Sequence, residues 1–211
     1  MRLAPPGLAA AFLMIVLSAA PAPAQSPTED MQQYTDEVAR LIRDVSSKEK
    51  DTLGSLQAAV RRLAFQIFGA PEAAREVLGR HWNERTPLEQ EDFTKLFAEL
   101  LEATYLAQVD TLGGSQVKIR YLGELIEGNR ADVRARLSGA KGRDVVVDAR
   151  LVRRDDRWLV WDVSIEGVSI IGNYRAQFDR IIRRSSYPEL VRQVTAKRDD
   201  LLSRRRAAAG E

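Results

Sequence analysis

Apolar residues in the first half of the chain recur every three or four positions, the spacing of one buried helix face. This pattern predicts one helix over 31–45 and a second over 53–67, which ends before Gly69. A short third helix is expected from Pro71 to Gly79, because proline suits the first turn of a helix and glycine its end.

The clearest helix start is the sequence Thr86-Pro87-Leu88-Glu89. Thr86 can cap the helix while the Glu89 carboxylate reaches back to it, the arrangement known as a capping box. The helix is expected to run to about Asp110, before a Gly-Gly pair. Its broad apolar face consists of Phe93, Leu96, Phe97, Leu100, Leu101, Tyr105 and Val109.

Beyond Gly114 the apolar period changes from 3.6 to 2, which is typical of strands with one buried face. Four strands are expected, over 116–121, 131–137, 145–152 and 158–165, with short turns between them. Strict alternation places the neighbours Trp161 and Asp162 on opposite faces of the last strand. Helical spacing returns after Gly167, and a final helix is expected from the capping sequence at Ser186.

This order of elements predicts an α+β fold in which helices cover a four-stranded antiparallel meander. Many large apolar residues occur in the helix from Pro87, at the inward strand positions and in the helix over 170–182. Such a supply fits a fully packed core, and it equally fits helices and a curved sheet that enclose an apolar cavity. Periodicity does not distinguish the two.

The first 24 residues resemble a secretory signal peptide. Arg2 provides a basic start, residues 7–17 form a short apolar run, and Ala22-Pro23-Ala24 provides a cleavage site before Gln25. We expect residues 1–24 to be removed and residues 25–211 to form a single domain; the alternative is an uncleaved N-terminal anchor. Export argues against a nucleic-acid partner.

The composition, with 45% hydrophobic and 29% charged residues, is that of a globular protein and not of a disordered or fibrous one. Acidic residues predominate before Thr111 and basic residues after it. The absence of cysteine excludes disulfides and thiol chemistry, and the single histidine, His81, excludes every site that needs two. With no glycine-rich phosphate loop either, the sequence predicts no enzyme, no metal site and no cofactor.

Two stretches of the chain resemble the MlaC family of phospholipid-binding proteins, auxiliary components of a toluene-tolerance type ABC transporter. The first contains LGRHWN over 78–83, TPLEQ over 86–90 and LLEATY over 100–105. The second, more specific stretch reads WLVWDVSIEGVSII over 158–171 and NYRAQF over 173–178. One departure is the acidic pair Glu91-Asp92, where a basic residue is expected before Phe93.

The resemblance implies an NTF2-like, cone-shaped fold with a deep pocket that receives the acyl chains of a phospholipid. It also implies a periplasmic shuttle between an outer-membrane lipoprotein complex and the MCE-domain subunit of an inner-membrane ABC transporter. No lipid chemistry is implied, and we expect a monomer.

On this basis we expect eight residues to line or gate a lipid pocket: Leu101, Tyr105, Val147, Trp161, Val168, Ile171, Tyr174 and Phe178. Any of them can instead belong to a plain packed core. Arg175 and Gln177 are candidates for contact with a head-group phosphate; the alternative is a structural hydrogen bond to Asp162 or Glu166.

Three other functions stay open at this point. The cargo can be a hopanoid or another lipid, because apolar walls discriminate poorly between tails. A periplasmic adaptor or chaperone would show an exposed apolar groove instead of an enclosed cavity. An NTF2-like enzyme would use Asp162, Glu166 or His81, and would need a carboxylate of raised pKa facing the cavity.

Overall fold

The computed structural model describes residues 25–46, 52–105, 118–139 and 144–209. Its first half is helical, as predicted, with α1 (Pro27–Ser46), α2 (Thr52–Ile67), α3 (Ala70–Leu78), the 3-10 helix η1 (Gly79–Glu84) and α4 (Pro87–Tyr105). The expected continuation of α4 to Asp110, including Val109, lies outside the described residues, as does the expected signal peptide over 1–24. Among the helices that are described, none has the length and apolar character needed to cross a bilayer.

The second half forms an antiparallel meander, followed by helices α6 (Ile170–Arg184) and α7 (Tyr187–Ala209). The strands are β1 (Lys118–Glu127), β2 (Arg130–Ser138), β3 (Asp144–Arg154), β4 (Arg157–Ile165) and β5 (Val168–Ser169), paired in that order. The prediction of four strands missed β5. Glu166 and Gly167 both adopt positive φ, 50° and 80°, so the chain turns back at once and pairs Val168 with Ile165 before α6 begins.

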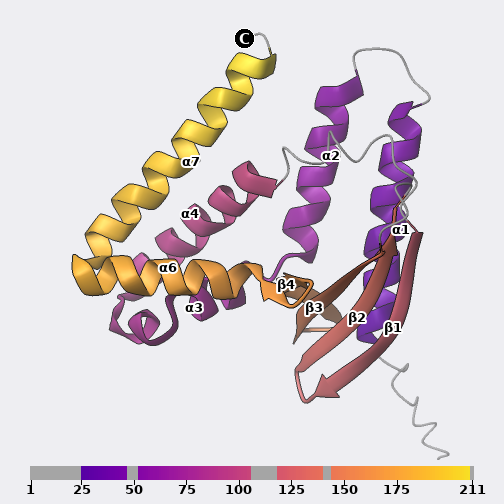
Figure 1. Ribbon diagram of the computed structural model, residues 1–211, viewed down its shortest axis with the longest axis horizontal. Helices are drawn as coiled ribbons and strands as arrows, with labels where there is room; N and C mark the ends of the chain where they lie inside the picture. The colour runs from indigo at the N-terminus through magenta and orange to yellow at the C-terminus, as the bar shows by residue number, and fades with distance from the viewer. Residues whose placement is uncertain (1–24, 47–51, 106–117, 140–143, 210–211) are drawn as a thin grey trace, which may run out of the picture.

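Helix α1 packs on one face of the sheet (Figure 1). The small core beneath it joins Met31 of α1 to buried residues of three strands, namely Ala131, Val133, Ala149, Leu151 and Trp158. Two polar side chains of α1 fix its position on β4. The buried Asp30 carboxylate accepts a hydrogen bond from the Trp158 backbone N–H at 2.8 Å, and the Tyr34 hydroxyl donates to the Trp158 carbonyl at 2.9 Å.

The larger core lies among α3, α4, α6 and α7, which Figure 1 shows gathered beside the sheet. Its centre is aromatic: Phe97 lies 6.0 Å from Phe93 and 5.8 Å from Phe178, measured between ring centroids. Tyr187 of α7 packs 6.2 Å from Phe93, so α4, α6 and α7 share the cluster. The edge-to-face geometry of Phe97 with Phe178 is one that aromatic rings favour.

Local capping signals fix the starts of α4 and α7. The predicted capping box of α4 is confirmed: the Thr86 N–H donates to Glu89 Oε2 at 2.8 Å, and the Glu89 N–H donates to Thr86 Oγ1 at 3.2 Å. At α7 only half of the box forms. Ser186 accepts from the Glu189 N–H, whereas the Glu189 carboxylate accepts from the Arg192 side chain.

Candidate functional site

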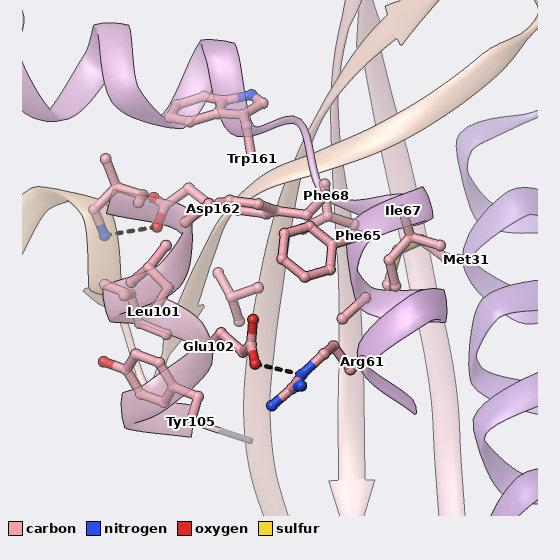
Figure 2. Close-up of a pocket in the computed structure, with 16 residues that line it drawn as sticks. Met31, Arg61, Phe65, Ile67, Phe68, Leu101, Glu102, Tyr105, Trp161 and Asp162 are labelled. Carbon is pink, nitrogen blue, oxygen red and sulfur yellow. Dashed lines mark hydrogen bonds and ion pairs between the residues drawn. The ribbon is translucent and has the colours of Figure 1, made fainter. Parts of the chain in front are cut away.

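A cavity of about 350 Å³ opens between α2, α4, β4 and the start of α6 (Figure 2). A cavity of this size lies at the lower end of the range that takes small-molecule ligands. Most of its lining is apolar and comes from Met31, Ala64, Phe65, Ile67, Phe68, Ala98, Leu101, Tyr105, Val160, Trp161, Val163, Ile170 and Ile171. A lining of this kind favours the apolar part of a ligand.

The two ends of the cavity differ in exposure. At one end Trp161 and Ile171 are 7% and 3% exposed, so this end is closed by protein. Tyr105, at the other end, is 38% exposed, and Phe65 on α2, which Figure 2 shows between Trp161 and Tyr105, is 51% exposed. Figure 2 shows Tyr105 on the opposite side of the cavity from Trp161. The cavity therefore has an apolar floor and a mouth that faces water.

Three charged residues also line the cavity: Arg61, Glu102 and Asp162. Arg61 of α2 forms an ion pair with Glu102 of α4. Asp162 has no exposed side-chain surface, and the chain itself uses its oxygens: they accept hydrogen bonds from Ser169 Oγ at 2.6 Å and from the Ile171 N–H at 3.0 Å. Asp162 thus holds the first turn of α6 against β4.

A bulge in the sheet explains why Trp161 and Asp162 both reach the cavity. Strict alternation predicted opposite faces, and that prediction was wrong. The register pairs Leu151 with Val160 and Arg150 with Asp162, so Trp161 is an extra residue on β4. Such a bulge bends the strand and redirects the side chains around it.

Four of the eight residues expected at a lipid pocket line this cavity: Leu101, Tyr105, Trp161 and Ile171. Burial, followed by the neighbouring Tyr174 hydroxyl, raises the pKa of Tyr105, so this phenol at the mouth is neutral at physiological pH. That these four residues contact lipid stays a prediction.

The other four candidates lie outside the lining. Phe178 packs in the aromatic core and Tyr174 lies 5.5 Å from both Phe97 and Phe178, although Tyr174 also neighbours Tyr105 at the mouth. Val168 is 58% exposed on β5, and Val147 pairs with Ile165 on the sheet. A lipid-binding role for these residues remains a prediction.

The two head-group candidates are also outside the lining. Arg175 lies over the backbone of Gly79, with Nη1 3.9 Å from the Glu76 carboxylate, and Gln177 is exposed. Asp162 and Glu166, proposed as alternative partners of Arg175 and Gln177, accept hydrogen bonds from other donors. Asp162 accepts from the Ile171 N–H at the start of α6, and Glu166 accepts from the Val146 N–H at 2.6 Å.

Sequence reasoning missed the part of the lining that α2 provides. The apolar spacing of α2 marks a stripe that includes Ala64 and Ile67, and both of these line the cavity. Arg61 and Phe65 also line it but do not belong to that stripe. These two residues are four apart and share a face. The available signal was a phenylalanine off the main apolar stripe with an arginine one turn before it.

The residues considered for catalysis do not converge. His81 donates or accepts through Nε2 at 3.0 Å from Asp179 on α6, away from the cavity lining. That contact is the largest cause of the lowered pKa of Asp179. Within the described parts of the chain, no cluster of acidic or histidine side chains could hold a metal ion.

Comparison with known proteins agrees with this architecture. The family described as "MlaC protein" matches residues 32–196. The intermembrane phospholipid transport system binding protein MlaC of Haemophilus influenzae is 24% identical over 172 residues, which are 80% of each chain. A phospholipid-binding protein from Ralstonia solanacearum, solved in complex with a phospholipid, matches the fold with a TM-score of 0.64 and 20% identity, over 82% of this chain and 97% of its own. The chain described here is a member of the MlaC family.

Proposed function

We propose that this protein is a periplasmic phospholipid carrier within an intermembrane lipid transport system, and that its cavity holds the acyl chains. The observation that carries the proposal is a cavity with an apolar floor at Trp161 and Ile171 and a water-facing mouth at Tyr105. A phospholipid is arranged in the same way, with apolar acyl chains at one end and a polar head group at the other. The names of the Haemophilus and Ralstonia proteins support the choice of ligand.

The physical requirement on such a carrier is to keep acyl chains out of water during transit. Each buried methylene contributes about 0.8 kcal/mol relative to water. A bilayer supplies the same contribution, so transfer between membrane and cavity is close to balanced. Small changes on docking to a partner are then enough to load or release the lipid.

Neither catalysis nor a cofactor is needed for this task, and we assign none. For partners we propose an MCE-domain subunit of an inner-membrane ABC transporter and an outer-membrane lipoprotein complex. The carrier moves between them as a monomer formed by residues 25–211, after removal of the signal peptide over 1–24.

Native mass spectrometry of the chain from Gln25, followed by solvent extraction, tests the proposal directly. We expect a co-purifying species with the mass of a phospholipid. A hopanoid or polyprenyl mass would keep the carrier function but change its cargo. Protein that is empty, and that also takes no lipid from vesicles, would contradict the proposal and favour an adaptor.

A pair of variants on α4 provides the matched control. Leu101→Glu places a charge among the apolar lining and should abolish lipid uptake. Acyl chains in the cavity would remove this unpaired carboxylate from water, which costs free energy. Leu88→Glu makes the same change at a leucine that is 67% exposed and outside the cavity, and should leave uptake unchanged. Equal uptake by the two folded variants would show that lipid does not enter this cavity.

A further inference from the structure

Two of the three charged residues of the cavity lie on the side of its mouth. Of the three charged residues in the lining, Asp162 is fully enclosed and already engaged by the start of α6. Arg61 and Glu102 are the other two, with side chains 45% and 15% exposed. Figure 2 shows their ion pair on the Tyr105 side of the cavity, away from Trp161. A ligand whose chains reach the floor would place its polar end beside Arg61.

The contact between Arg61 and Glu102 uses one edge of the guanidinium. Nε of Arg61 meets Oε1 of Glu102, as the dashed line in Figure 2 marks. Within the described part of the chain, Glu102 is the acidic partner of Arg61. Since a guanidinium carries five N–H donors in a rigid fork, a contact through Nε leaves the four donors of the terminal amino groups for a second anion. Glu102 therefore orients Arg61 without using up its capacity to bind.

From this arrangement we infer that Arg61 binds the phosphodiester of the lipid at the mouth of the cavity. The inference rests on the proposed function and names the side chain that binds the negatively charged group of the ligand. Guanidinium pairs with phosphate oxygens in a bidentate manner, and such charge-assisted hydrogen bonds are stronger than neutral ones. Glu102 acts in the opposite sense: its negative charge lies beside the phosphate and weakens the binding.

The inference predicts selection for a phosphate group independently of the acyl chains. The delipidated chain from Gln25 is incubated with vesicles that contain phosphatidylglycerol and a diacylglycerol of the same chains, and the two bound lipids are quantified by mass spectrometry. The variants are Arg61→Gln and Glu102→Gln. Arg62→Gln is the control, because Arg62 is an exposed neighbour on α2 outside the cavity lining.

We expect Arg61→Gln to lower the ratio of bound phospholipid to bound diacylglycerol about tenfold or more, the effect of losing one charge-assisted hydrogen bond. Arg62→Gln should leave the ratio unchanged, and Glu102→Gln should raise it severalfold. An unchanged ratio in Arg61→Gln, or equal loss of both lipids, would overturn the inference. If Arg61→Gln does not fold, Glu102→Gln decides, since an unchanged ratio there contradicts the opposing role of its charge.

Two further results distinguish lipid phosphate from free phosphate, and failure of the Arg61 assignment from failure of the carrier function. An excess of inorganic phosphate should not reduce phospholipid loading, because it has no chains to hold it in the cavity. If it abolishes the preference for phospholipid, Arg61 binds free phosphate and the assignment to lipid is wrong. Wild-type protein that takes up neither lipid refutes the carrier function itself, whereas uptake of both without preference refutes only the role of Arg61.

Discussion

Replacing Asp162 by alanine should destabilise the protein strongly, because this one carboxylate joins β4 to the start of α6. Its side chain is fully enclosed, and it accepts hydrogen bonds from the Ile171 N–H at 3.0 Å and from Ser169 Oγ at 2.6 Å. An unsatisfied buried N–H at Ile171 costs about 1–3 kcal/mol, and the lost bond from Ser169 to a charged acceptor about 1.5–3 kcal/mol. The Arg150 side chain is 47% exposed, so its contact at 3.3 Å adds little.

The expected loss is therefore about 2.5–6 kcal/mol in the free energy of unfolding, to be measured by urea denaturation. Asp148→Ala on β3 is the matched control: Asp148 is ion-paired to Arg134, whose side chain is 63% exposed, and its loss should cost about 0–1 kcal/mol. If Asp162→Ala and Asp148→Ala lower stability by the same small amount, the assignment of Asp162 as the anchor of α6 is wrong.

Two smaller effects should also be measurable. Gly79→Ala should cost about 1–3 kcal/mol in thermal unfolding, because Gly79 combines a φ of 53° with a ψ of −123°, a conformation that L residues rarely adopt, and a side chain there would meet the Arg175 guanidinium. Gly139→Ala should be close to neutral, because none of the described residues lies within contact of a side chain there. The lowered pKa of Asp179, caused chiefly by His81, means that Asp179 stabilises the fold above the ordinary carboxyl pKa of 3.8 and that this contribution is lost as pH falls through the lower folded-state pKa. Urea unfolding of Asp179→Asn between neutral and acid pH should therefore show a weaker loss of stability in acid than the wild type, and an unchanged profile would contradict it.

The fold followed from the sequence where the signals are local. Apolar spacing placed the helices, and the side chains of Thr86 and Glu89 form the capping box that their spacing predicted. The missed strand β5 depends on positive φ at Glu166 and Gly167, of which only the glycine leaves a sequence signal. Local chemistry predicts where elements begin and end, but it does not predict short pairings that a turn creates.

The candidate site was only half predictable, because core and cavity share one apolar face of α4. Phe93 and Phe97 on that face are buried in the aromatic core, whereas Leu101 and Tyr105, one and two turns further on, line the cavity. What separates them is the position of α2, which brings Arg61 and Phe65 across from the end of α4. That position depends on tertiary contacts that periodicity along α4 does not record.

The floor and the mouth of the cavity are held by different kinds of contact, and this difference suits a carrier. Three consecutive residues of β4 fix the floor: the Val160 carbonyl accepts from the Gly69 N–H at the end of α2, Trp161 packs in the helical core, and Asp162 holds α6. At the mouth, by contrast, α2 meets α4 through the ion pair of Arg61, whose side chain is 45% exposed, with the more buried Glu102. Because the Arg61 side of this pair is open to water, we expect it to hold α2 against α4 less firmly than the several enclosed contacts hold the floor. In the proposed carrier, the head group binds beside Arg61 without altering the floor, and the contact between Arg61 and Glu102 is the place where a docking partner would act on release.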